Sequence, residues 1–144
     1  MIDGSVLVEA VVTALQGVPA LVTAVDEDEE RIYGYHDTYP ATVSLSFAIH
    51  QIPSPGVMVS YEGIMPGSFG NAEVWKHQLA IYLRAGAAES GNPYSVMFAA
   101  IMTLQYATIH ASCYPMESIS LERRSDAEAV DFFAIPVTFT EIGG

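Results

Sequence analysis

The segment from Pro93 to His110 constrains the fold of this chain more than any other. Asn92 suits a helix N-cap and Pro93 suits the first helical position, so we expect a helix to begin there. One broad face of this helix is apolar, formed by Tyr94, Met97, Phe98, Ile101, Met102, Leu104 and Ile109. The opposite face is uncharged, formed by Ser95, Ala99, Thr103, Tyr106 and His110.

The uncharged opposite face of this helix has two interpretations. A helix face that meets water usually carries Lys and Glu, and this one carries neither. Its five residues are therefore a candidate subunit interface. Alternatively, the helix is central and packs on both sides within its own domain.

A first helix is predicted near the N-terminus, over residues 5–16. Its apolar residues recur at helical spacing, at Val8, Val11, Val12 and Leu15. Gly17 and Pro19 are stop signals, and Asp3 or Ser5 suits the N-cap.

Several other segments have the two-residue period of half-buried strands. We predict strands at residues 42–50, 57–62, 75–84, 118–123 and 131–141. Residues 20–25 and 31–35 are predicted to form a hairpin around the acidic run 26–30, and the Gly- and Pro-rich residues 65–73 to form a loop. Pro136 cannot donate a ladder hydrogen bond, so its strand is expected to lie at the sheet edge or to bulge there.

The order of these elements is helix, four or five strands, helix and two strands. Short turns join most of the strands, which indicates an antiparallel arrangement. We therefore predict a single α+β domain over residues 1–144, with a mostly antiparallel (mixed) β-sheet. The N-terminal helix and the second helix, at about 93–110, are expected to pack on one face of the sheet.

The composition indicates more apolar surface than a small domain can bury. Apolar residues make up 51% of the chain and charged residues only 15%. The surplus points to a membrane, a large ligand or neighbouring subunits. The longest charge-free stretch, residues 90–116, contains Pro93 and Pro115 and lacks flanking Lys or Arg, so we expect no membrane span.

The net charge of −12 argues against binding of nucleic acid, because phosphate backbones are held by clustered Lys and Arg. Such a chain could still line a path that DNA crosses without sticking. Cys113 is the single cysteine, so no intramolecular disulfide can form, which fits synthesis in a reducing cytoplasm.

No residue pattern indicates catalysis, a metal site or a cofactor, so we do not expect an enzyme. His36 and Asp37 are adjacent and are expected in a loop, rather than aimed at one another. His110 and Cys113 have the spacing of two metal ligands but lack a second pair. His50 and His77 are expected to be packed or surface histidines.

The acidic run has two interpretations. It consists of Asp26, Glu27, Asp28, Glu29 and Glu30. The simpler interpretation is a solvated hairpin tip. The functional one is a ring of carboxylates around a pore in a symmetric assembly, which would discourage DNA adhesion or collect divalent cations weakly.

The order of the predicted elements resembles that of a known family. The N-terminal helix is followed by the strands VMVSYEG and WKHQLAIYLRA, the helix NPYSVMFAAIMTLQYATIH, and then SISLERR and DFFAIPVTFTEIG. From about residue 5 to the end, this order and strand texture resemble the tail terminator (neck) proteins of long-tailed bacteriophages. Residues 26–41 look like extra material beside that family.

The resemblance implies a mechanical function. It implies a ring, typically a hexamer, that caps the tail tube, offers a surface to a head-side connector or stopper protein, and leaves a channel through which DNA passes without specific binding. The expected location is the virion neck, after assembly in the host cytoplasm. The alternatives are another neck ring, a tail tube subunit, or a small-molecule-binding or enzymatic α+β domain with Tyr61, Trp75 and Tyr82 around a pocket.

Overall fold

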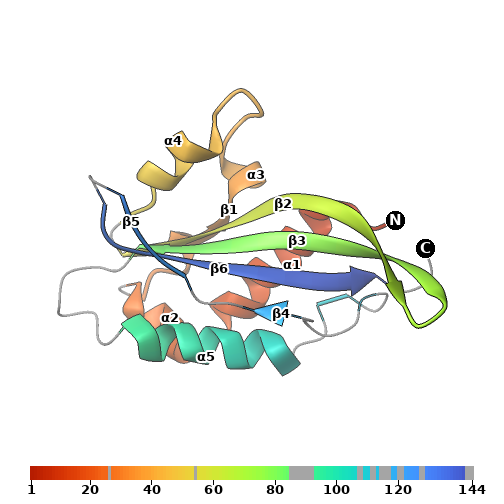
Figure 1. The fold of residues 1–144 in the computed structure, drawn as a ribbon. Coiled ribbons are helices and arrows are strands. Elements are labelled where there is room, and N and C mark those ends of the chain that lie inside the picture. The colour runs from red at the N-terminus through yellow and green to blue at the C-terminus, as the bar shows by residue number, and fades with distance from the viewer. Residues whose placement is uncertain are drawn as a thin grey trace.

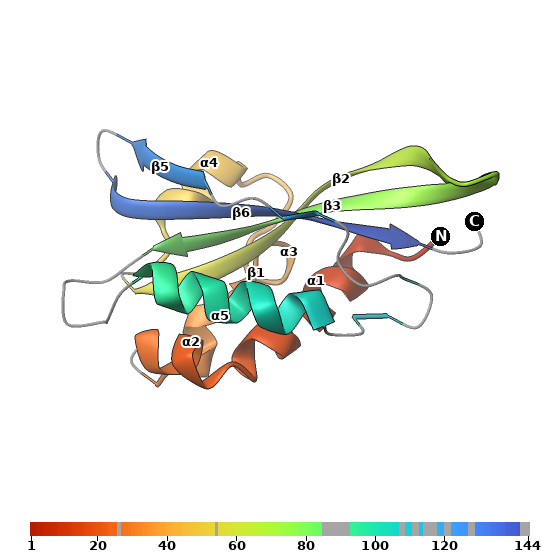
Figure 2. The ribbon, with the colours of Figure 1, turned by 60° about the horizontal axis from the view of Figure 1, so that its bottom comes forward.

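The computed structural model describes residues 1–25, 27–53, 55–84, 93–106, 109–110, 113, 118–119, 122–126 and 129–141. The elements in this part of the chain are α1 (Gly4–Gln16), α2 (Pro19–Ala24), the 3₁₀ helix η1 (Glu29–Arg31), β1 (Ile32–Gly34), α3 (Tyr35–Thr38), α4 (Leu45–His50), β2 (Gly56–Phe69), β3 (Ala72–Arg84), α5 (Pro93–Tyr106), β4 (Ser118–Ile119), β5 (Glu122–Asp126) and β6 (Ala129–Glu141). The helices α1, α2 and α5 lie on one face of a twisted sheet, and α4 lies on the other (Figures 1 and 2).

The described strands form one mixed sheet in the order β1-β2-β3-β6-β4, with β5 also paired to β6. The short β1 runs parallel to β2, and the other described pairings are antiparallel. The predicted α+β class, with a mostly antiparallel sheet and both main helices on one face, is confirmed.

Helix α1 forms as its sequence predicts. The Asp3 side chain accepts a hydrogen bond from the backbone N–H of Ser5 at 2.9 Å, so Asp3 is the N-cap. The helix ends at Gln16, before Gly17. Its buried residues are Leu7, Val8, Val11 and Leu15. Leu7 is buried although the predicted apolar set does not include it, and Val12, which belongs to that set, is only half-buried.

Two apolar clusters flank the sheet. The larger one joins α1, α2 and α5 to one sheet face, through residues that include Leu7, Leu15, Leu21, Val59, Leu79, Ile81, Leu104, Ile135, Val137 and Phe139. The smaller one joins the α4 segment to the other face, through Ala48, Ile52, Met58, Ala80, Tyr82 and Ala134. The sheet is therefore the layer that the two clusters share.

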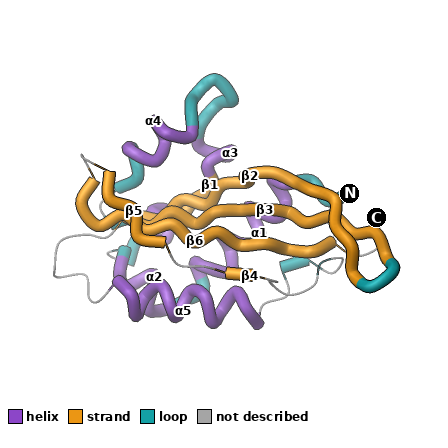
Figure 3. The backbone as a smooth tube through the Cα atoms, in the orientation of Figure 1, coloured by secondary structure: helices purple, strands orange, loops and turns teal. Residues whose placement is uncertain are grey.

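The hairpin of β2 and β3 is longer than predicted. Its register runs from Gly56 opposite Arg84 to Phe69 opposite Ala72, so the predicted loop at 65–73 is wrong. Gly70 has φ = +61° in the two-residue turn, a conformation that glycine adopts without strain. The pairing of β3 with β6 is described only as far as Trp75 opposite Glu141, and the hairpin extends past that point (Figure 3).

Two predicted strand segments are helical instead. Residues 20–25 lie in α2, which has Pro19 at its first position, so they do not form a hairpin with 31–35. Residues 42–50 contain α4, whose N-cap Ser44 accepts a hydrogen bond from Phe47 N–H at 3.2 Å. Both segments are short, and a short apolar run fits the period of a helix as well as that of a strand.

The remaining differences concern strand ends and neighbours. Residues 31–35 give the parallel strand β1 and the start of α3, and residues 118–123 are divided between β4 and β5. Strand β6 is not an edge strand, because β3 lies on one side of it and β4 and β5 on the other. Pro136 pairs with Ala80 in a continuous register, so the predicted edge or bulge is wrong. On the other side of β6, strands β4 and β5 pair with it in one common register before and after Pro136, so this side shows no bulge there either.

Candidate functional site

Helix α5 turns a narrow apolar side inward and a second apolar side outward. Ala100 and Leu104, four residues apart, are buried against the α1 and α2 layer. Phe98 and Met102, which the sequence predicts on the same broad apolar face as Leu104, are instead 58% and 51% exposed. Phe98 and Met102 are four residues apart, so they form an exposed apolar stripe on α5.

The predicted interface residues of this helix lie beside that stripe or outside the described part. Thr103 is exposed, and Ala99 and His110 are half-buried. The side chains of Ser95 and Tyr106 lie outside the described residues. Helix α5 ends at Tyr106 rather than at His110, so His110 follows the helix.

The acidic run forms an exposed turn, not a hairpin tip. Asp26 lies outside the described residues, and Glu27, Asp28, Glu29 and Glu30 are all exposed between α2 and β1. Asp28 caps η1, and its carboxylate lies 3.7 Å from the guanidinium of Arg31. These carboxylates lie on an exposed turn. Their placement around a channel stays a prediction.

A buried polar cluster lies on the core-facing side of the sheet, near the end of β6. The Tyr61 hydroxyl lies 2.8 Å from Nδ1 of His77, and Nε2 of His77 lies 3.8 Å from Oε1 of Glu141. His77 is fully buried and Glu141 nearly so. If Tyr61 donates to Nδ1, the imidazole proton lies on Nε2 and faces the carboxylate, which is the favourable arrangement.

Burial controls the protonation of this cluster. Desolvation lowers the pKa of His77, although the charge of Glu141 and its hydrogen bonding oppose this effect. Desolvation raises the pKa of Tyr61, and the nearby charge of Glu141 adds to the rise. Among the described residues, neither Nε2 of His77 nor Oε2 of Glu141 has a hydrogen-bond partner. Neutral His77 is therefore the favoured form at neutral pH.

The same cluster ties distant parts of the chain together. The backbone N–H of Ile2 donates to Oε1 of Glu141, and Cys113 forms an isolated bridge with Glu141. Burial, followed by the charge of Glu141, raises the pKa of the Cys113 thiol to about 11. Through these contacts the cluster joins the N-terminus, β2, β3 and β6.

The sequence carries a signal for this cluster in the patterns of two predicted strands. His77 lies on the same apolar side of one predicted strand as Leu79, Ile81 and Leu83. Glu141 likewise shares a side with the apolar residues of another predicted strand. An ionisable residue at a core-facing strand position requires a partner. The sequence does not reveal that the two strands are neighbours, and only their register brings the residues together.

The other histidines do not assemble a reactive site. His36 and Asp37 are exposed on α3, so the predicted loop position is wrong, and the His36 ring contacts the ring of Tyr35. His50 Nδ1 lies 2.7 Å from the backbone oxygen of Ser46. His110 and Cys113 are joined through the backbone, where Cys113 N–H donates to His110 O at 3.0 Å. The described residues contain no group of three or more metal-ligating side chains.

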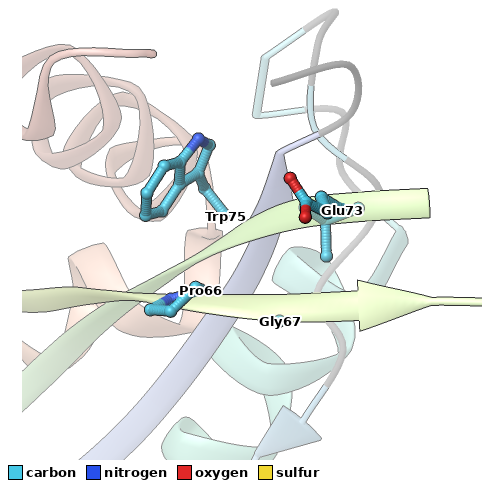
Figure 4. A pocket seen from close by; sticks show the side chains of 5 residues that line it. Pro66, Gly67, Glu73 and Trp75 are labelled. Atoms are coloured by element: carbon cyan, nitrogen blue, oxygen red, sulfur yellow. The ribbon is translucent and has the colours of Figure 1, made fainter.

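The three aromatic residues considered for a pocket do not converge. Tyr61 belongs to the buried cluster, and the Tyr82 hydroxyl donates to Glu62 at 2.5 Å on the other side of the sheet. Trp75 alone lines a cleft, of about 470 Å³, on the β2–β3 hairpin. Its other lining residues in the described chain are Pro66, Gly67, Glu73 and Val74 (Figure 4).

In the part of the chain that the structure describes, no helix has both the length and the apolar character needed to cross a bilayer. Comparison of the sequence with models of known protein families finds no match, and comparison with curated proteins finds none either.

Proposed function

We propose that this chain is a structural subunit that assembles with copies of itself into a ring. The ring would lie at the neck of a long-tailed bacteriophage, where it caps the tail tube beneath the head-side connector. The exposed apolar stripe on α5 carries the proposal. Phe98 and Met102 lie on a helix without a charged residue in a protein whose net charge is −12.

A closed ring requires two different contact surfaces on each subunit, because each copy meets one neighbour on either side. The β2–β3 hairpin also carries two exposed apolar residues, Ile64 and Met65, whose side chains leave β2 on opposite sides. Stable interfaces are enriched in aromatic residues and Met and are depleted in charge at their centres. The exposed pair Phe98 and Met102 on α5 has this character.

The position at the neck is supported by the order of elements and by charge. An N-terminal helix, a long hairpin, the helix α5 and the final strands follow one another as in the tail terminator family that the sequence resembles. The exposed carboxylates at residues 27–30 and the overall negative charge would repel DNA in transit. Another neck ring or a tail tube subunit is the alternative within the same class.

The test is the oligomeric state of matched variants. Phe98→Glu places a charge in the stripe, and Phe47→Glu makes the same change at a phenylalanine that is 55% exposed on α4, beyond the opposite face of the sheet. Light scattering after size-exclusion chromatography is measured for each chain alone and with the tail tube protein of a long-tailed bacteriophage.

We expect a ring for the parent chain and for Phe47→Glu, and loss of the ring for Phe98→Glu. A ring that survives the Phe98→Glu change would remove α5 from the interface. A parent chain that remains monomeric in both conditions, at every concentration, would overturn the ring itself.

A further inference from the structure

The cleft on the β2–β3 hairpin has a chemical character that the ring proposal does not use. Glu73 and Trp75 are two residues apart on β3, so their side chains leave the strand on the same side, as Figure 4 shows. Pro66 is the cross-strand partner of Trp75 and forms the adjoining wall. Glu73 is exposed and Trp75 is half-buried, so one end of the cleft is wet and the other is apolar.

This combination of groups suits a cation. The face of an indole ring attracts positive charge through its quadrupole, and a carboxylate attracts it directly. Residues i and i+2 of a strand are about 6.6 Å apart. That spacing admits one flat group that stacks on the ring and reaches the carboxylate.

A guanidinium group fits better than an ammonium group. It is planar, it stacks on aromatic faces, and it donates two parallel hydrogen bonds to one carboxylate. An ammonium group is compact and more strongly hydrated, so it loses more hydration free energy when it leaves water.

Lys76, Arg31 and Arg84, the basic residues whose side chains the structure describes, do not provide this cation; the side chains of Arg123 and Arg124 lie outside the described residues. Lys76 leaves β3 on the opposite side from Trp75, and its Cε lies close to Gly67. Arg31 donates to the backbone oxygen of Pro55, and Arg84 donates to the backbone oxygen of Ile52 at 2.9 Å. With five basic residues against seventeen acidic ones, a second copy is a poor source of the cation.

We propose that the cleft formed by Pro66, Glu73 and Trp75 binds an arginine side chain of a basic partner protein. The binding site belongs to the hairpin of a single chain. It adjoins Ile64 and Met65, which the ring proposal uses, but it lies within one chain, so its test does not require a ring.

The chain itself supplies the probe, because Trp75 is its single tryptophan and reports directly on the cleft. The emission of Trp75 is followed at low ionic strength while N-acetyl-arginine amide is added. The matched ligand is N-acetyl-citrulline amide, which has nearly the same shape and no charge. We expect a saturable change with the arginine ligand and none with the citrulline ligand.

Two variants locate the charge that is responsible. Glu73→Gln should weaken binding of the arginine ligand about fivefold, as for the loss of one exposed ion pair. Glu30→Gln removes the same charge from η1, which lies beside the other end of β2, and should leave the affinity unchanged. The proposal is overturned if the arginine ligand gives no saturable change, if citrulline binds equally, or if both variants weaken binding alike.

Discussion

Replacement of Leu104 by alanine tests which side of α5 faces the core, on which the assembly proposal depends. Leu104 is fully buried, whereas Met102, two residues earlier, is about half exposed. The Leu104→Ala change removes three buried carbon atoms, worth roughly 2.4 kcal/mol at about 0.8 kcal/mol each, and leaves a cavity whose cost is added. We therefore expect the free energy of unfolding to fall by about 3 kcal/mol.

The matched change is Met102→Ala. About half of the Met102 side chain already contacts water, and alanine is the best helix former, so the loss should stay below about 1 kcal/mol. Both variants are unfolded in urea and followed by circular dichroism at several protein concentrations, because oligomerisation stabilises the native state by mass action. A Met102→Ala loss that equals or exceeds the Leu104→Ala loss at the lowest concentration would refute this orientation of α5.

Two further predictions concern the buried cluster. Because burial holds the pKa of His77 below its ordinary 6.5, the unfolded chain takes up the proton first, so stability is lost as the pH falls below 6.5 through the folded value. His77→Gln should make the free energy of unfolding fall less steeply in that range, and parallel curves for the two proteins would contradict this. Cys113 should react with a thiol reagent far more slowly in the native protein than in the unfolded chain, because its thiol is buried and its pKa is about 11. Equal rates would contradict this burial.

The sequence predicts the elements that have a strong period and a clear cap. Helix α1 has both, through its valines and Asp3, and helix α5 begins where Pro93 indicates. The short segment around α4 has an alternating pattern that fits a strand, but Ser44 caps a helix there and Ala48 packs in the second apolar cluster. Tertiary packing decides the structure of such short segments.

The candidate sites depend on contacts that a single sequence does not encode locally. The exposure of Phe98 follows from the rotation of α5 about its axis, which is set by the small Ala100 and by Leu104 packing on α1 and α2. The cleft beside Trp75 exists because residues 65–73 continue the hairpin, although glycine and proline favour a loop there. Predicting the exposure of Phe98 requires knowing which helices α5 packs on, and predicting the cleft requires knowing the register of β2 and β3.

The hydrogen bond from Ile2 to Glu141 places the beginning of the chain beside the last described residue of β6. The described part of the backbone therefore begins and ends close together, at the end of β6. Folds with adjoining ends tolerate circular permutation, in which a short linker joins the old ends and new ones are cut in an exposed turn. The turn at Gly70 is such a position, so these elements can be connected in more than one order along a chain.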